Sequence, residues 1–155
     1  MPSVIHLFIA PKRGDPMSSI LSIEALADCG LRGDRYATDL GRKNPDSQVT
    51  LIEIENIEEF RESTGLYLEP DAPRRNIVTR GVKLNDLCRK RFLVGGVTLE
   101  GIELCEPCGL FAKRTYKSVL KLFVGKGGLR ARIVTGGTIR VGDSVIETGK
   151  SQPKV

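Results

Sequence analysis

Short apolar runs separated by glycine turns are the feature that most limits the folds open to this chain. In the second half, such runs occupy residues 91–95, 97–104, 129–134, 138–141 and 144–147. The pairs Gly95-Gly96, Gly136-Gly137 and Gly142-Asp143 fall between them. Glycine readily adopts the positive φ angles that two-residue hairpin turns require. Short strands at this spacing predict a mainly β fold, and we expect a β-barrel with a few short helices.

The rest of the chain adds strands, helices and one long loop. Further strands are expected at residues 4–10, 21–27, 48–54 and 75–81. A helix is predicted from Asn56, which can cap its start, to Gly65, which can end it. Helical spacing of apolar residues predicts a second helix over 111–124, and residues 84–88 predict one helical turn. The Gly-, Asp- and Arg-rich segment 30–48 predicts an ordered loop, of a length that is often functional.

Composition fits an ordinary globular protein. The 155 residues are 40% hydrophobic and 28% charged, which predicts one domain over residues 1–148, followed by a disordered tail over 149–155. No basic segment precedes the first apolar run and no run reaches membrane-spanning length, so we expect a cytoplasmic protein without membrane contact. The net charge of +5 suits an anionic small ligand or an acidic partner. Aromatic residues make up only 5%, which argues against nucleic acid.

The stretch ELCEPCGLF places Cys105 and Cys108 in a C-x-x-C pattern. Structural zinc needs four ligands, and the other candidates, His6, Cys29 and Cys88, are scattered, so zinc is not predicted. A thioredoxin-like redox pair is an alternative, because a strand, C-E-P-C and a helix are expected in that order. The lack of any proline between residues 107 and 153 weighs against this alternative.

Cys108 stands apart from the other three cysteines. Pro107 must end the strand and Gly109 opens the turn, so Cys108 is expected at a strand-to-helix corner. A position near a helix N-terminus favours the thiolate, which is the form that binds soft metals or carries sulfur. Cysteine also serves as a small buried hydrophobe, which we expect for Cys29 and Cys88 and leave open for Cys105.

Three segments are candidates for contact with an anion. In PRRNIV, the guanidinium groups of Arg74 and Arg75 can fork onto phosphate, and the amide of Asn76 can both donate and accept. Neighbours on a strand face opposite ways, so one of the two arginines is expected to be a solvated surface charge. In GLRGDRY, Asp34 and Arg35 either pair to hold the loop or contact a ligand. GKGGLRAR lacks the P-loop spacing, so it predicts a connector into a hairpin, with backbone amides that could meet an anion.

Taken in order, GLRGDRYA, QVTLIE, RRNIVTRGVKLNDLCRKRFLVGGVTLEGIELCEPC and GGLRARIVTGGTIRVGDSV resemble a MOSC domain. This domain forms the C-terminus of molybdenum cofactor sulfurases and also occurs as stand-alone bacterial proteins. The resemblance runs from about Val4 to Glu147. It implies a barrel-like β fold and one essential cysteine that carries sulfur or binds the molybdenum of molybdopterin. The family cysteine maps onto Cys108, and the Arg-x-Asn element that helps to hold the cofactor maps onto Arg74 and Asn76.

The resemblance implies two functions. In the first, Cys108 binds the molybdenum cofactor, Arg74, Arg75, Asn76 and Arg35 surround it, and the protein reduces N-hydroxylated or N-oxide small molecules with electrons from a separate redox protein. In the second, Cys108 carries persulfide sulfur received from a pyridoxal-phosphate-dependent cysteine desulfurase. The pyridoxal-phosphate domain of a complete sulfurase would not fit into 155 residues, so that enzyme is expected to be a separate partner. A homodimer that completes the cofactor site is also compatible with the resemblance.

Overall fold

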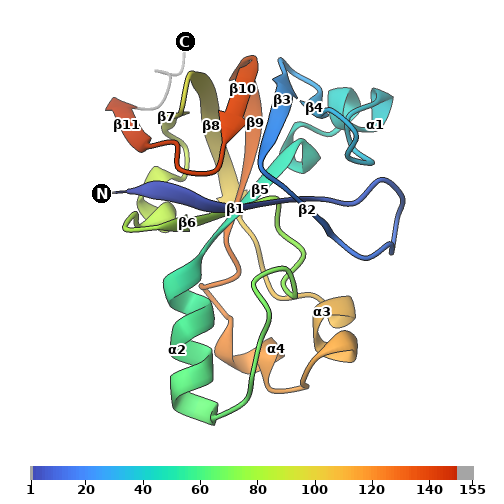
Figure 1. Cartoon of the computed structure of the whole chain (residues 1–155), viewed down its shortest axis with the longest axis vertical. Coiled ribbons are helices and arrows are strands. Elements are labelled where there is room, and N and C mark those ends of the chain that lie inside the picture. The colour runs from blue at the N-terminus through green and yellow to red at the C-terminus, as the bar shows by residue number, and fades with distance from the viewer. Residues whose placement is uncertain (1, 150–155) are drawn as a thin grey trace.

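The computed structural model describes residues 2–149, and an eight-stranded sheet dominates it (Figure 1). The strands are β1 (Ser3–Ile9), β2 (Ser18–Ile20), β5 (Val49–Glu53), β6 (Ile77–Arg80), β7 (Arg91–Val94), β8 (Val97–Leu104), β9 (Leu129–Thr135) and β11 (Val145–Gly149). They pair in the order β11-β7-β8-β9-β5-β6-β1-β2. Neighbours are antiparallel except β5 and β6, which run parallel and therefore need a crossover connection.

A second, smaller sheet contains β3 (Ser22–Leu26), β4 (Gly30–Leu31) and β10 (Gly137–Arg140), in the order β10-β3-β4. β10 directly follows β9 in the chain, but it turns away at Gly136 and pairs with β3. An isolated bridge between Ser3 and Ser144 brings β1 next to the segment before β11. The predicted mainly β class is therefore confirmed, whereas the two sheets are not closed into a barrel.

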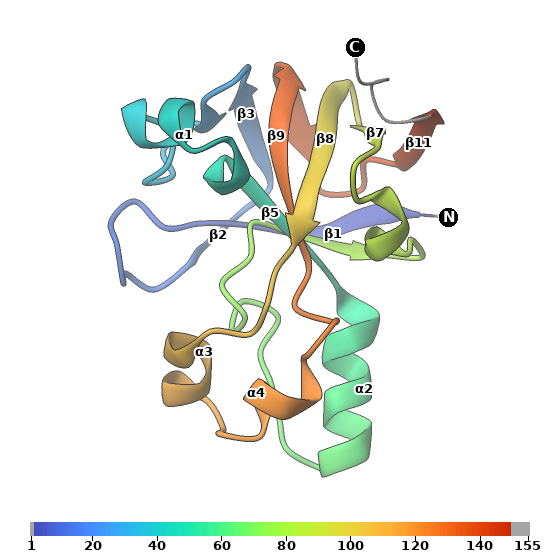
Figure 2. The same ribbon diagram turned by 180° about the vertical axis from the view of Figure 1, so that it is seen from behind.

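Short helices fill the connections. They are α1 (Asp39–Lys43), α2 (Ile54–Thr64), α3 (Gly109–Arg114), α4 (Val119–Leu122) and the 3-10 helices η1 (Pro45–Ser47) and η2 (Leu84–Leu87). Both views place α2, α3 and α4 together below the large sheet, at the opposite end from β3 and β10 (Figures 1 and 2). α2 begins the crossover between the parallel strands β5 and β6. The molecule thus has a strand-rich end and a helical end.

Two hydrophobic clusters hold these ends together. The first combines residues of both sheets, such as Leu51, Ile77 and Ile139, and the second joins Ile52 and Val78 to apolar residues of the three helices. Adjacent residues of β5 and β6 thus belong to different clusters, so both faces of these strands are covered. Strands buried on both faces carry consecutive apolar residues, as Leu51-Ile52 and Ile77-Val78 do here.

Tertiary contacts changed two of the predicted helices. Gly65 ends α2 in the left-handed conformation as predicted, but Asn56 does not cap its start: Glu53 occupies that position, and Asn56 Nδ2 donates to the carbonyl of Lys126. The predicted helix over 111–124 is two short helices. Thr115 interrupts it, because its hydroxyl donates to the Phe111 carbonyl and its backbone leaves the helical region.

The predicted loop over 30–48 is ordered, but it contains β4, α1 and η1. The strand β2 and its pairing with β1 were also missed, because Ser18, Ser19 and Ile20 carry almost no apolar signal. The predicted disordered tail falls largely on residues 150–155, which lie outside the described residues, although Gly149 still belongs to β11. Within residues 2–149, no helix is long and apolar enough to cross a membrane.

Candidate functional site

Cys108 lies where the sequence predicted, at the corner between β8 and α3. It is the N-cap residue of α3, and the backbone N–H of Phe111 donates to its Sγ at 3.4 Å. The residue is exposed, whereas Cys29 and Cys105 are buried and Cys88 is half-buried. Among the four cysteines, Cys108 is therefore the one whose sulfur is most open to a ligand or a partner.

Cys105 has the opposite environment. Its side chain is fully buried, and its backbone N–H donates to the Gly128 carbonyl at 2.8 Å. Burial raises the pKa of the Cys105 thiol, although Arg75 and Arg130 pull that pKa down. All four cysteines are free thiols. Cys105 thus belongs to the packing, as one of the sequence interpretations proposed, and this arrangement gives the C-x-x-C redox alternative no support.

A cavity of about 200 Å³ brings the predicted site residues together. Its lining includes all five of them: Arg35, Arg74, Arg75, Asn76 and Cys108. They come from three segments that are far apart in the sequence, namely the loop after β4, the turn before β6 and the corner before α3. Their role as cofactor ligands stays a prediction, but their convergence on one cavity is a property of the fold.

Two of these five residues are buried, and their side chains form hydrogen bonds within the protein itself. Arg75 is only 8% exposed, and its guanidinium donates to the carbonyls of Gly127 at 2.8 Å and Glu106 at 3.2 Å. Asn76 Oδ1 accepts from the backbone and the hydroxyl of Thr50, while its Nδ2 donates to the Phe8 carbonyl. The side chain of Asn76 therefore ties together the strands around the cavity.

Arg74 is the member of the arginine pair that stays available. Its guanidinium has no hydrogen bond or ion pair with the other described residues. Partial burial lowers the pKa of Arg74, and the positive charges of Arg114 and Arg35 lower it further. Its backbone is left-handed, with φ of 63°, which is a strained conformation for a residue with a side chain. One of the two arginines was expected to be solvated, and the structure separates them: Arg75 is buried and hydrogen-bonded, whereas Arg74 is half-buried and lines the cavity.

Asp34 and Gln48 hold the loop that carries Arg35. The two oxygens of the buried Asp34 carboxylate accept from the backbone N–H groups of Ala10 and Tyr36. Of the two alternatives for Asp34 and Arg35, an internal pair is not found among the described residues: the Arg35 guanidinium donates to the Tyr36 hydroxyl at 2.6 Å. Gln48 is fully buried, and its amide bridges Asp28, the Gly41 carbonyl and the N–H of Ile133.

The glycines of GKGGLRAR serve close packing. A side chain on Gly127 would meet the Cys105 carbonyl oxygen at 2.4 Å, and one on Gly128 would meet that of Leu51 at 2.0 Å. Gly128 also has φ of 109°, which L side chains rarely adopt. From this segment only Arg130 lines the cavity. The sequence pattern did not single out Arg130 as a site residue, because the glycines beside it dominate the motif.

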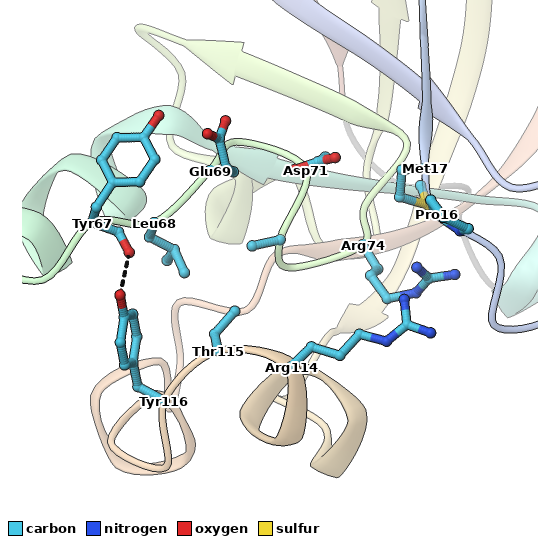
Figure 3. Close-up of a pocket in the computed structure, with 11 residues that line it drawn as sticks. Pro16, Met17, Tyr67, Leu68, Glu69, Asp71, Arg74, Arg114, Thr115 and Tyr116 are labelled. Carbon is cyan, nitrogen blue, oxygen red and sulfur yellow. Dashed lines mark hydrogen bonds between the residues drawn. The ribbon is translucent and has the colours of Figure 1, made fainter.

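A larger cavity, of about 380 Å³, adjoins the first (Figure 3). Arg74 and Met17 line both. The larger cavity lies between the segment before β6 and the turn that joins α3 to α4, and it also contains Arg114. Sequence analysis did not single out Arg114. Its position six residues after Cys108, across a short helix, was the available signal.

The donor set around Cys108 fits a cofactor that brings its own metal ligands. Within residues 2–149, no group of three or more His, Cys, Asp or Glu side chains is placed to hold a metal ion. A single accessible sulfur suits a soft metal that already has sulfur ligands from an organic group. The cations Arg35, Arg74 and Arg130 beside it suit the phosphate of such a group.

Comparison with known families identifies the domain to which this fold belongs. The model of the MOSC domain matches residues 38–146. This match covers more than half of the chain and includes Cys108, Arg74 and Asn76. The chain therefore belongs to the MOSC domain family. A comparison with curated proteins gave no significant match.

Several solved structures share the fold. The YuaD protein from Bacillus subtilis superposes with a TM-score of 0.77 at 16% identity, covering 94% of this chain and 94% of that one. YiiM from Geobacillus stearothermophilus gives 0.78 at 14% identity, over 96% and 76% of the two chains. YiiM from Escherichia coli gives 0.70 at 14% identity, over 97% and 71%. At these identities the likeness establishes the fold alone.

Proposed function

We propose that this protein binds the molybdenum cofactor through Cys108 and reduces N-hydroxylated or N-oxide compounds. The observation that carries the proposal is the exposed thiol of Cys108 in one cavity with Arg35, Arg74 and Arg130. A soft ligand and a set of cations in the same cavity match the two chemically distinct ends of a metal-bearing pterin phosphate. Membership of the MOSC family supports the assignment.

The residues of the chain then divide the work. Cys108 supplies the protein ligand, while Arg35, Arg74 and Arg130 neutralise the phosphate. Arg75 and Asn76 fix the backbone on which these groups stand, through their bonds to Gly127, Glu106, Thr50 and Phe8. The cofactor, when bound, supplies the oxygen-atom transfer chemistry. Conversion of N–OH to N–H consumes two electrons and two protons and releases water, so a separate redox protein must deliver the electrons.

The test compares two cysteine variants. The wild type, Cys108→Ser and Cys105→Ser are purified without oxygen from a host that makes the cofactor, and bound molybdenum and pterin are measured. We expect the wild type to retain both molybdenum and pterin. Cys108→Ser should retain about one tenth of the wild-type amounts or less, and Cys105→Ser should retain the same amounts as the wild type. Folded wild-type protein without molybdenum, or equal retention in Cys108→Ser, would contradict the proposal.

The exposure of Cys108 also supports a second candidate, transfer of sulfur between proteins. A persulfide carrier must present its thiol to a cysteine desulfurase, and only Cys108 among the four cysteines is exposed. Incubation with a pyridoxal-phosphate-dependent desulfurase and cysteine should then add the mass of one sulfur atom to the peptide that contains Cys108. A spectrum without this adduct would eliminate the carrier function and leave the molybdenum proposal untouched.

A further inference from the structure

The larger cavity shares Arg74 with the proposed cofactor site and has further features of a ligand site, among them Arg114, that the cofactor proposal does not use. Its volume of about 380 Å³ falls within the range of small-molecule pockets. In Figure 3, Arg74 and Arg114 extend toward the same end of it, next to Met17. Tyr67 and Tyr116 mark the opposite end. The cavity is therefore elongated, with two cations at one end and an apolar and aromatic remainder.

The two guanidinium groups form an electrostatically strained pair. Arg114 is exposed and donates to the Gly14 carbonyl at 2.5 Å, which holds its guanidinium near that of Arg74. Arg74 has no such partner among residues 2–149. Repulsion from Arg114 is among the causes that lower the pKa of Arg74, second to burial. Two like charges held together in this way are stabilised by an anion that lies between them.

The acidic residues of the cavity do not neutralise this pair. Glu69 takes part in a hydrogen bond with the phenol of Tyr67, which raises the pKa of Tyr67. Asp71 contributes least among the named causes of the Arg74 pKa, and no ion pair joins it to either arginine within the described residues. The end of the cavity near Arg74 therefore keeps a net positive charge.

The walls away from the arginines are suited to an apolar group. Leu68 and Ala72 come from the segment before β6, and Thr115 and Tyr116 come from the turn after α3. The Tyr116 hydroxyl donates to the Tyr67 carbonyl at 3.0 Å and ties the two walls together at the far end. Burial of an aromatic ring against such walls is favourable by the hydrophobic effect alone.

We propose that this cavity binds a small organic anion, a carboxylate or phosphate monoester with an apolar or aromatic body, whose charged group lies between Arg74 and Arg114. Because Arg74 and Met17 also line the Cys108 cavity, the bound molecule lies directly beside that cavity. Its identity as the substrate rests on the proposed function, whereas its binding does not. The inference thus names the chemical class of molecule that this face of the protein selects.

The experiment measures binding by the full chain as purified, with three probes followed by NMR or calorimetry. Benzoate has both the charge and the ring, benzamide has the ring without the charge, and acetate has the charge without the ring. We expect benzoate to bind at least about tenfold more tightly than either of the others. Equal affinity for benzoate and benzamide, or for benzoate and acetate, would overturn the proposal.

Two variants of equal net charge locate the site. Arg114→Gln removes one cation of the pair, and Arg140→Gln removes an exposed arginine of β10 at the strand-rich end of the molecule. We expect Arg114→Gln to abolish the preference for benzoate over benzamide, and Arg140→Gln and Arg114→Lys to keep most of it. Loss of the preference in both glutamine variants would mean that the net charge of the protein alone attracts benzoate. That result would overturn the proposed site between Arg74 and Arg114.

A last arm separates this ligand from a bare oxyanion and from the cofactor. Phenyl phosphate should bind more tightly than inorganic phosphate, because its ring contacts the apolar walls. Equal affinities would mean that the arginine pair binds phosphate alone, and this result would overturn the proposal. The molybdenum content of each preparation is measured in parallel. Because Arg74 lines both cavities, probe binding is judged in protein without molybdenum, where no cofactor competes for this residue. Failure of probe binding there contradicts the anion site, whereas failure to retain molybdenum contradicts the proposed function, so the two failures are distinguishable.

Discussion

The arginine pair before β6 and the cysteine pair after β8 divide their work in the same way. Each pair puts two residues of one type close together in the sequence, and in each pair one member is buried while the other is accessible from the cavity. Arg75 and Cys105 are enclosed by backbone, whereas Arg74 and Cys108 remain accessible. Residue type alone therefore does not identify a functional side chain, because a residue of the same type supports the scaffold one position away in the arginine pair and three positions away in the cysteine pair.

The two buried members also connect the segments to each other. The Arg75 guanidinium donates to the Glu106 carbonyl, between the two cysteines, and to the Gly127 carbonyl in the turn before β9. The N–H of Cys105 donates to the next carbonyl in that turn, that of Gly128. The accessible residues Arg74 and Cys108 thus stand on backbone that their buried partners fix in place, which is how a loop site gains rigidity.

The largest expected effect is a difference in protein stability between variants of the two arginines. Arg75→Met should lower the free energy of unfolding by about 3 kcal/mol, because the buried Gly127 carbonyl and the part-buried Glu106 carbonyl lose their donor. Arg74→Met should change it by less than about 0.5 kcal/mol, because no hydrogen bond is lost. Urea denaturation of both variants measures the difference. Similar losses in the two variants would show that the division of roles is wrong.

The second prediction concerns the pH dependence that buried Cys105 introduces. Burial raises the pKa of this thiol, so the folded protein keeps its proton while the unfolded chain releases it near the ordinary value of 9.0. Stability contributed by this difference is complete below pH 9 and is lost as the pH rises above it. Between pH 7.5 and pH 10, the wild type should lose roughly 1 kcal/mol more than Cys105→Ala. Parallel curves of unfolding free energy against pH for the two proteins would contradict this prediction.

The smallest effect concerns the strained backbone at Arg74. Arg74→Gly should raise the free energy of unfolding by about 0.5 kcal/mol, because glycine tolerates positive φ. Arg89 provides a matched control, since it is exposed, has φ of 64° and lies outside both cavities. Arg89→Gly should give the same gain in stability, while only Arg74→Gly should weaken molybdenum retention and benzoate binding. An unchanged ligand affinity in Arg74→Gly would remove Arg74 from both proposed sites.

The features predicted correctly were those that depend on neighbours in the sequence. Gly65 ends α2 and Gly95-Gly96 joins β7 to β8 as expected, because a left-handed cap and a two-residue turn are local geometries. Asn56 was misassigned because its amide bonds to a residue 70 positions away. β2 was missed for a similar reason, since it exists by pairing with β1 and has little apolar pattern of its own.

The sequence predicted which residues line the candidate site better than it predicted what each of them does there. Cys108 could be chosen because Pro107 and Gly109 fix the corner on which it lies, and the structure places it there. The proximity of Arg114 and Arg130 to Arg74 could not be predicted, because it depends on how α3 and β9 approach the turn before β6. A pair between Asp34 and Arg35 was one of two alternatives for these adjacent residues, whereas the Asp34 carboxylate accepts from the N–H of Ala10 across the loop.

The sequence by itself determined the β class, most strand positions, the family resemblance and the cysteine on which the chemistry was expected to depend. These follow from periodicity, turn residues and ordered motifs, which are written along the chain. Only the tertiary structure decided which arginine stays free, which cysteine is buried and that two cavities share Arg74. Burial and hydrogen bonding between distant segments make these choices, because a side chain is available for a ligand only after the fold has satisfied its own buried carbonyls and amides.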